Sequence, residues 1–309
     1  MTIPIIKKRE AKFYMGIGGK GIGKSFTSIQ LMEQYKSGNP QTGLKPRKVL
    51  IFDVNDEFTQ YNPIDCTVEN ICVFVKQPKI EIRRVSPKKQ GRIKTMQDFR
   101  QDLEVILKYF MNGLLVLEDL TLIVGDAVSQ NLVGALSTIR HKDVDVIIHF
   151  QSIAKFAHPK YKALRNVLRL HKASDSSNRS RVKENLGEDY PKVRIAELIV
   201  GNRYMYGVRK MQELEAKGRG EGDKEWEIAD KKFRRFFMYV DFDNQKLFGN
   251  FSKKEFDEAV SMYLQEEEAD EIRPMLKLRD TKTGVTKYNF QTAIKEKMIE
   301  FNMLYGNKA

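Results

Sequence analysis

Apolar residues follow a regular plan through the first half of the chain, where short, mostly apolar runs alternate with longer stretches of helical spacing. The runs fall at residues 13–15, 48–54, 114–117, 144–150 and 167–170. A nearly continuous apolar run is typical of a parallel strand that is covered on both faces. The alternation over residues 12–172 therefore predicts an α/β fold with a mostly parallel central sheet flanked by helices.

The segments between these runs carry apolar residues at steps of three and four, which is the spacing of one helix face. The expected helices carry their first apolar positions at Ile22, Met96 and Val128. Gly113 follows the second of these segments, and we interpret it as a helix C-cap. Residues 58–94 lack a clear pattern, and we interpret them as an insertion with short strands at 73–75 and 80–85.

The second half of the chain predicts a long helix, a hairpin and two further helices. The long helix is expected at residues 193–211, and two strands at 236–240 and 246–248 flank a polar turn. Ser252 and Glu255 have the spacing of a capping box, while Phe251 and Phe256 have that of a hydrophobic staple. These two pairs predict the start of a helix. Apolar residues from Phe290 to Phe301 mark the final helix.

The length of 309 residues allows one large domain with additions. We expect a core at residues 1–265 that includes the insertion, followed by a C-terminal helical extension at residues 266–309.

A glycine-rich loop lies between the first expected strand and the first expected helix. Its sequence matches the phosphate-loop pattern GxxxxGK[ST] and runs through Gly18, Gly19, Lys20, Gly21, Ile22, Gly23, Lys24 and Ser25, with Phe26 next. Glycines leave the backbone N–H groups open to the phosphates. Lys24 is expected to reach the β and γ oxygens, and the Ser25 hydroxyl to ligate Mg²⁺. The loop therefore predicts binding of ATP or GTP with Mg²⁺.

Two acids follow the apolar strand at residues 114–117, where nucleotide hydrolases place their magnesium-shell and water-orienting carboxylates. Glu118 occupies the metal-side position and Asp119 the water-activating position, the reverse of the usual Asp-Glu order. The alternative is an exposed acidic turn after a core strand. Asp53 and Glu57 follow another strand, and they are further candidates for contact with magnesium-bound or attacking water, or are acids of a turn.

The order of these segments resembles the FtsK/HerA superfamily of DNA-pumping ATPases, including packaging ATPases of some viruses and zonula occludens toxin-like proteins of filamentous phages. The resemblance is carried by residues 51–58, 139–151 and 166–171 together with the phosphate loop. It implies a RecA-like core, with Arg140 as an arginine finger toward a neighbouring subunit and Gln151 as a sensor of the γ-phosphate. Without it, Arg140 would be a cation at a helix end and Gln151 a cap on a strand.

The resemblance also implies partners. These are double-stranded DNA, further copies of the chain in a hexameric or pentameric ring, and a capsid portal or vertex. The net charge of +13 is consistent with a polyanionic partner or with a solvated basic surface. The basic residues that are candidates to line a DNA channel are Lys88, Lys89, Arg92, Lys94, Arg165, Arg169, Arg179, Arg181, Arg219, Lys231, Lys232, Arg234 and Arg235.

Three functions therefore stay open. The first is an ATP-hydrolysing DNA translocase of the genome-packaging type, with a zonula occludens-type phage morphogenesis ATPase as a close alternative. The second is a small-molecule P-loop kinase, for which residues 178–183 are a candidate lid. The third is a nucleotide switch, although no Asn-Lys-x-Asp motif for guanine follows the core strands, so ATP is the expected nucleotide.

The remaining features bear on location and metal content. No apolar run is long enough to span a bilayer and no secretory signal is evident, so we expect the cytoplasm, the host cytoplasm or a virion. Cys66 and Cys72 do not have the spacing of a zinc site. The four histidines lack cysteine or paired-acid companions in the sequence, so we expect them to be structural or to face nucleic acid.

Overall fold

The computed structural model describes residues 10–41, 43, 45–89, 91–119, 130–173, 179–266, 272–276 and 290–306. They form two compact units. The first comprises Met1–Ile17 and Gly23–Asn166, and the second comprises Gly18–Ile22 and Val167–Ala309. The boundary near residue 265 stays a prediction, and the units are described separately.

The first unit is built on a parallel sheet. Its strands are β1 (Phe13–Ile17), β2 (Lys48–Phe52), β3 (Ile82–Val85), β6 (Gly113–Leu117) and β7 (Val144–Phe150). They lie in the order β1-β7-β6-β2-β3, and each neighbouring pair is parallel. The carboxyl ends of all these strands therefore meet at one edge of the sheet, where open α/β sheets bind ligands.

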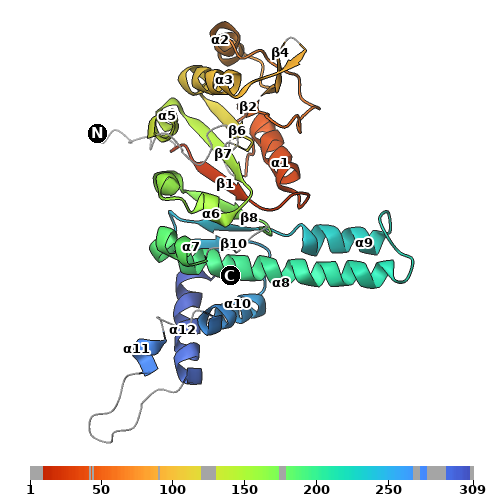
Figure 1. Cartoon of the computed structure of the whole chain (residues 1–309), viewed down its shortest axis with the longest axis vertical. Coiled ribbons are helices and arrows are strands. Elements are labelled where there is room, and N and C mark those ends of the chain that lie inside the picture. The colour runs from red at the N-terminus through yellow and green to blue at the C-terminus, as the bar shows by residue number, and fades with distance from the viewer. Residues whose placement is uncertain are drawn as a thin grey trace, which may run out of the picture. The chain divides into compact units, whose positions relative to one another are not determined.

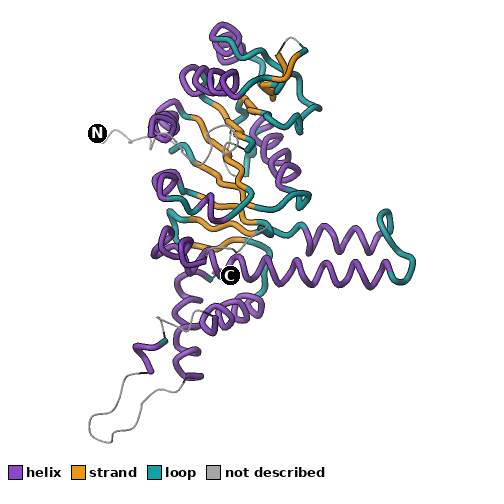
Figure 2. Tube along the Cα trace, in the orientation of Figure 1, coloured by secondary structure: helices purple, strands orange, loops and turns teal. Residues whose placement is uncertain are grey.

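Helices cover both sides of this sheet (Figures 1 and 2). They are α1 (Lys24–Ser37), α2 (Val68–Lys76), α3 (Met96–Tyr109), α5 (Gln130–Ile139) and α6 (Ile153–Phe156), with 3-10 turns η1 (Arg140–Lys142) and η2 (Pro159–Leu164). A small hairpin pairs β4 (Lys88–Lys89) with β5 (Arg92–Ile93). Buried apolar side chains such as Met32, Val49 and Val116 join α1 to the sheet.

Two local predictions in this unit are wrong. Residues 73–75, expected as a strand, lie in α2, where Ile71 and Phe74 are buried at helical spacing and the Thr67 hydroxyl accepts a hydrogen bond from Asn70 N–H. Gly113 is not a helix cap but the first residue of β6. A Cβ at Gly113 would come within 2.6 Å of the Lys48 carbonyl oxygen, so this glycine permits close packing of β6 on β2. By contrast, the strand expected at 80–85 is present as β3.

The second unit combines three antiparallel strands with helices. The strands are β8 (Val167–Leu170), β9 (Met238–Asp241) and β10 (Lys246–Phe248), and β9 pairs with both of the others. The helical elements are α7 (Arg179–Leu186), η3 (Gly187–Asp189), α8 (Tyr190–Glu215), α9 (Lys224–Ala229), η4 (Asp230–Arg234), α10 (Lys253–Glu266), α11 (Arg273–Leu276) and α12 (Phe290–Tyr305). The predicted hairpin and helices are confirmed, and α8 extends beyond the predicted 193–211.

α8 lies side by side with α9 and the π-helical turn η4 (Figure 1). Gly207 allows this approach, because a Cβ there would lie 2.8 Å from the Arg234 backbone nitrogen and from Phe233 Cβ. No helix among the described residues is both long enough and apolar enough to cross a membrane.

These observations confirm the predicted fold class. The first unit has the mostly parallel, helix-flanked sheet of a RecA-like P-loop fold, and β7 lies between the phosphate-loop strand β1 and the acidic strand β6. The second unit supplies the C-terminal hairpin and helices.

The start of α10 agrees with its sequence signals in detail. The Ser252 backbone N–H donates to Glu255 Oε2 at 2.7 Å, and Glu255 N–H donates to Ser252 Oγ at 3.3 Å, which completes the capping box. The Phe251 and Phe256 rings stack with centroids 6.1 Å apart, which confirms the staple. Glu255 also receives Arg203 Nε from α8 at 2.6 Å, so the box holds α8 and α10 together.

We predict that Glu255→Gln destabilises the second unit in a pH-dependent way. Hydrogen bonds from the Arg203 guanidinium lower the pKa of Glu255 from 4.5 to about 2. Because the folded pKa lies below the ordinary value, the ion pair stabilises the fold fully above pH 4.5, and this stabilisation is lost as the pH falls toward 2. Urea unfolding at pH 7 should show a loss of about 1.5–3 kcal/mol.

Glu258→Gln on the same helix is the matched control. Glu258 is 55% exposed and its oxygen lies 3.8 Å from Lys254, so the change should cost less than about 0.5 kcal/mol. Equal stability losses in the two variants, or a Glu255→Gln loss that does not shrink between pH 7 and pH 3, would contradict the prediction.

Candidate nucleotide-binding site

The phosphate loop connects β1 to α1 and depends on left-handed backbone. Gly21 has φ 75° and Gly23, the N-cap of α1, has φ 91°, which side chains other than glycine disfavour. A Cβ at Gly18 would lie 2.4 Å from Ile22 Cδ1, and the Gly19 N–H donates to the Lys172 carbonyl at 2.8 Å. The helix that follows presents its unpaired N–H groups and positive dipole end at the loop. This geometry suits an anionic ligand.

Ser25, the predicted magnesium ligand, lies on the first turn of α1. Its hydroxyl donates a hydrogen bond to Glu57 Oε2 at 2.7 Å. Glu57 follows β2, so the structure brings together two residues that are 32 positions apart in the sequence. A hydroxyl and a carboxylate in contact form the all-oxygen donor set that Mg²⁺ prefers.

Asp53 has a different environment from Glu57. Its side chain is fully buried, and its two oxygens accept hydrogen bonds from the backbone N–H groups of Glu57 at 2.9 Å and Phe58 at 3.0 Å. Arg84 Nη1 from β3 donates to the same carboxylate at 3.1 Å. Asp53 therefore organises the turn that carries Glu57. The Arg84 guanidinium also bonds Asp56, which lowers the pKa of the Asp56 carboxyl.

Glu118, at the end of β6, is buried and paired with a histidine. Its Oε2 lies 2.6 Å from His149 Nδ1, and His149 Nε2 lies 2.8 Å from Ser28 Oγ on α1. His149 is fully buried, so of the two roles expected for the histidines it has the structural one. The adjacent-strand register places Leu117 opposite Ile148, which sets Glu118 beside His149. The sequence alone does not carry that pairing.

Asp119 lies at the centre of a second polar cluster. Its φ is 42°, and its carboxylate accepts hydrogen bonds from Asn55 Nδ2 at 2.9 Å and from Gln151 Nε2 at 3.3 Å. Asp119 and Gln151, both predicted site residues, therefore meet at the carboxyl edge of the sheet. Asn55 completes the cluster and had not been singled out from the sequence. Gln151 Nε2 also lies 3.4 Å from the other Asp119 oxygen, and an amide beside a carboxylate is suited to orienting a water molecule.

Arg140 lies away from the other predicted site residues. Its Nη2 donates to Asn166 Oδ1 at 3.0 Å, and its guanidinium lies 4.7 Å from the centroid of the Phe13 ring. Phe13 is the first residue of β1, whereas the phosphate loop follows the last. Arg140 is therefore at the opposite edge of the sheet from Asp119 and Gln151 in the same chain.

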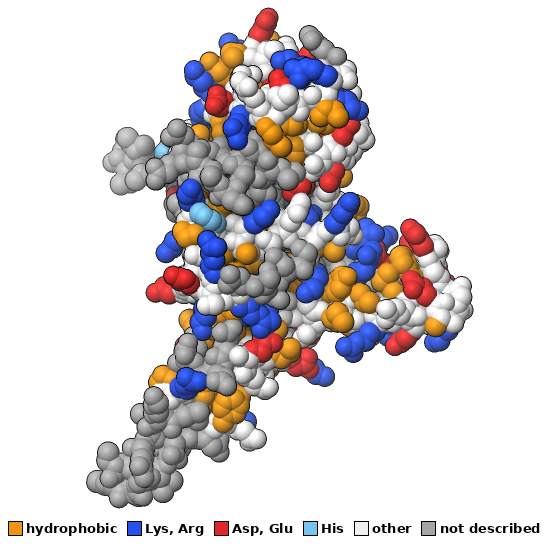
Figure 3. All heavy atoms as spheres, viewed as in Figure 1, with side chains coloured by type: hydrophobic (Ala, Val, Ile, Leu, Met, Phe, Trp, Pro, Cys, Tyr) orange, Lys and Arg blue, Asp and Glu red, His pale blue; other side chains and the backbone are white. Residues whose placement is uncertain are grey.

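Several candidate DNA-contacting residues are occupied inside the fold. Lys94 is buried and forms an ion pair with Asp102 Oδ2 at 2.8 Å, and Arg165 is buried and donates to the Ala157 carbonyl at 2.7 Å. Arg169 is buried within the second unit. These three residues do not line an exposed surface, which corrects their inclusion. On the face shown in Figure 3, Lys and Arg side chains are spread among acidic and apolar ones.

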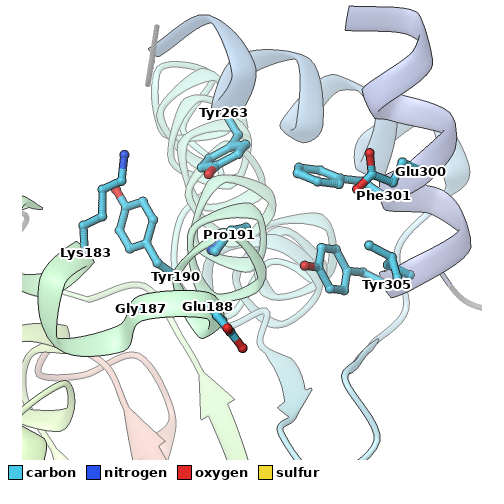
Figure 4. Close-up of a pocket in the computed structure, with 10 residues that line it drawn as sticks. Lys183, Gly187, Glu188, Tyr190, Pro191, Tyr263, Glu300, Phe301 and Tyr305 are labelled. Carbon is cyan, nitrogen blue, oxygen red and sulfur yellow. The ribbon is translucent and has the colours of Figure 1, made fainter. Parts of the chain in front are cut away.

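A separate pocket of about 290 Å³ lies within the second unit. Figure 4 shows the rings of Tyr190, Tyr263, Phe301 and Tyr305 around it. Its lining includes none of the residues predicted to bind nucleotide, so we treat it as distinct from the phosphate-loop site.

Comparisons with known proteins identify structural likenesses but no sequence family. No protein-family model and no curated protein matches the sequence. The genome packaging NTPase B204 of Sulfolobus turreted icosahedral virus 2, solved with AMP, aligns at 12% identity and TM-score 0.46, over 78% of this chain and 98% of that chain. The DNA-packaging ATPase B204 of Sulfolobus turreted icosahedral virus aligns at 12% identity and TM-score 0.41, over 77% and 95%.

A third likeness is to the N-terminal domain of zonular occludens toxin from Neisseria meningitidis, at 17% identity and TM-score 0.31, over 54% of this chain and 79% of that chain. All three likenesses are below 20% identity. Because the TM-scores are low, the fold assignment rests on the strand order and the phosphate loop of the chain itself.

We predict that Asp53→Asn destabilises the first unit, because the buried carboxylate holds two backbone N–H groups and Arg84. Loss of its charge should reduce the free energy of unfolding by about 1.5–3 kcal/mol in urea titrations. Asp65→Asn, at an exposed acid of the same connection, should change it by less than about 0.5 kcal/mol. Equal effects of the two variants would refute the organising role of Asp53.

Proposed function

We propose that this chain is a magnesium-dependent ATPase that moves double-stranded DNA as a homo-oligomeric ring of the genome-packaging type. The observation that carries the proposal is the left-handed phosphate loop between β1 and α1, with Asp119 and Gln151 in contact at the same edge of the sheet. A loop of this kind binds a triphosphate, and a carboxylate with an amide at its side serves hydrolysis.

The residues present fit a nucleotide and Mg²⁺. Among the described residues, chain neighbours aside, no atom lies within 4 Å of the position a Cβ would take at Gly21, so the loop is open on that side. The loop N–H groups and Lys24 would hold the phosphates. Ser25 would hold Mg²⁺ together with Glu118 or with Glu57, whose carboxylate accepts a hydrogen bond from the Ser25 hydroxyl. When bound, Mg²⁺ neutralises charge on the phosphate oxygens. Asp53 would act on a metal-bound water only through the turn it organises.

Asp119 and Gln151 are the proposed catalytic pair. Asp119 would accept the proton of the attacking water and Gln151 would orient that water or report the γ-phosphate. Glu118, one residue earlier, would contribute from the metal side. This assignment keeps the roles inferred from the sequence and adds Asn55, whose amide restrains the Asp119 carboxylate.

Arg140 is proposed to act on the nucleotide of a neighbouring subunit. In its own chain it lies at the edge of the sheet opposite the phosphate loop. A guanidinium supplied by another subunit would stabilise charge on the transferring phosphoryl group. The site would then be complete only in an assembly, for which we propose a hexameric or pentameric ring.

DNA is the proposed cargo because of the net charge of +13 and the basic residues that remain on the surface, such as Lys89, Arg181 and Lys231. The proposed setting is the host cytoplasm or a virion, with a capsid portal or vertex as docking partner. A zonula occludens-type morphogenesis ATPase would share the same site chemistry. For a small-molecule kinase, Asn178 of the candidate lid falls outside the described residues, and Arg179–Leu186 form α7.

We predict that Lys24→Ala lowers the rate of ATP hydrolysis by about 100-fold or more, because the cation that would contact the γ-phosphate is lost. Steady-state phosphate release measures this. Lys36→Ala, in the last turn of the same helix and exposed, is the matched control and should keep wild-type activity. Long double-stranded DNA should stimulate hydrolysis by the wild type.

Three results would count against the translocase. Hydrolysis indifferent to Lys24→Ala would remove the nucleotide site, and transfer of phosphate to a small acceptor would favour the kinase. DNA binding that does not weaken steeply with rising salt would oppose a phosphate-backbone contact. A mass measurement of the protein with a non-hydrolysable ATP analogue reports the ring size.

A mixing experiment tests the placement of Arg140. Lys24→Ala and Arg140→Ala should each be inactive alone. The first variant loses the phosphate contact of its own site, and the second loses the arginine finger that would reach a neighbouring site. Mixed in equal amounts, they should regain hydrolysis, since an intact Arg140 can then face an intact phosphate loop.

Lys24→Ala mixed with Asp119→Asn is the control pair. Both residues belong to the same chain's site, so no combination of these subunits contains a complete site, and activity should stay absent. Recovery in both mixtures, or in neither, would contradict the proposed role of Arg140 across subunits.

A further inference from the structure

The buried chain of contacts from Ser28 through His149 to Glu118 links the phosphate-loop helix to the acidic strand. We propose that His149 is a positioning residue that fixes the Glu118 carboxylate relative to α1, an inference that rests on the proposed ATPase function. Ser28 and His149 are 0% exposed and Glu118 is 2% exposed. The imidazole touches one partner with each ring nitrogen, at 2.6 Å and 2.8 Å.

The hydrogen-bonding capacity of Ser28, His149 and Glu118 defines which group donates in each of the two contacts. An ionised carboxylate only accepts, so the Glu118 contact places a proton on His149 Nδ1. In the neutral imidazole, Nε2 is then an acceptor, and the Ser28 hydroxyl donates to it. A serine hydroxyl can donate or accept, so Glu118 selects the Nδ1–H tautomer and Ser28 holds the other ring nitrogen. This is the arrangement by which an outer partner orients an imidazole in enzyme sites.

The place of the Ser28–His149–Glu118 contacts in the fold indicates that they do more than fill the core. Ser28 lies one helical turn after Lys24, on the helix whose first turn carries Ser25. Glu118 immediately precedes Asp119, which meets Gln151 and Asn55. His149 thus connects the residues that would hold phosphate and metal to the acids that would serve hydrolysis. A wholly apolar core would pack β6 and β7 without the desolvation cost of a buried carboxylate and imidazole.

Two substitutions of His149 separate its contact with Glu118 from its contact with Ser28. Asn can place its amide nitrogen near the position of Nδ1, and Gln can place its amide near Nε2, so His149→Asn retains the Glu118 contact and His149→Gln retains only the Ser28 contact. We expect His149→Gln to lower kcat by about tenfold or more with the affinity for ATP changed by less than about twofold. His149→Asn should recover most of the lost kcat.

A readout independent of hydrolysis comes from the imidazole itself. Proton–nitrogen correlation spectra of the nucleotide-free protein should show His149 as the Nδ1–H tautomer, and Ser28→Ala should alter that signal. Detection of the Nε2–H tautomer in the wild type would overturn the proposal.

The kinetic outcomes distinguish this inference from the proposed function. If the wild type hydrolyses ATP, Lys24→Ala does not, and His149→Gln keeps wild-type kcat, then only the role of His149 fails. Equal losses in His149→Asn and His149→Gln would also refute it, because a merely structural histidine predicts no difference between them. If Lys24→Ala hydrolyses ATP like the wild type, the proposed function fails and the role of His149 fails with it.

Discussion

The left-handed turn at Gly21 and Gly23 fixes the position of the phosphate loop, to which the other residues of its site must come. It ends β1 and starts α1 within a few residues, so the unpaired N–H groups of the helix point to the carboxyl edge of the sheet. Because the strands of the first unit are parallel, the acids after β2 and β6 and the glutamine after β7 reach the same edge. Chemistry that is scattered over more than 130 residues of sequence is therefore gathered by one topological rule.

Features that depend on local sequence were predictable. The bounds of β7 and β8 agree with the mostly apolar runs at 144–150 and 167–170, since a strand covered on both faces leaves a nearly continuous apolar signature. The capping box at Ser252 and Glu255 was predictable for the same reason, because its hydrogen bonds join residues three positions apart. The phosphate loop is also a contiguous motif, and its backbone conformation follows from its glycines.

Features that depend on which strands are neighbours were not predictable. The contacts of Ser25 with Glu57 and of Glu118 with His149 join residues about 30 positions apart, and they follow from strand order and register. Gly113 was misassigned because a C-cap and a tight strand contact both select glycine. Arg165 was counted among surface cations because charge in a sequence does not reveal whether backbone carbonyls will surround it.

The acids of the site already have hydrogen-bond partners within the protein, and binding of a metal–nucleotide complex must compete with some of them. Glu57 accepts from Ser25, Glu118 contacts His149, and Asp119 accepts from Asn55 and Gln151. Binding of a metal–nucleotide complex at Ser25 must exchange the Ser25–Glu57 hydrogen bond for new contacts, so its net affinity is the difference between the two sets. The bonds to Asp119 and Glu118 can persist through that exchange. They keep each carboxylate in place before the substrate arrives, which lowers the cost of reorganisation during reaction.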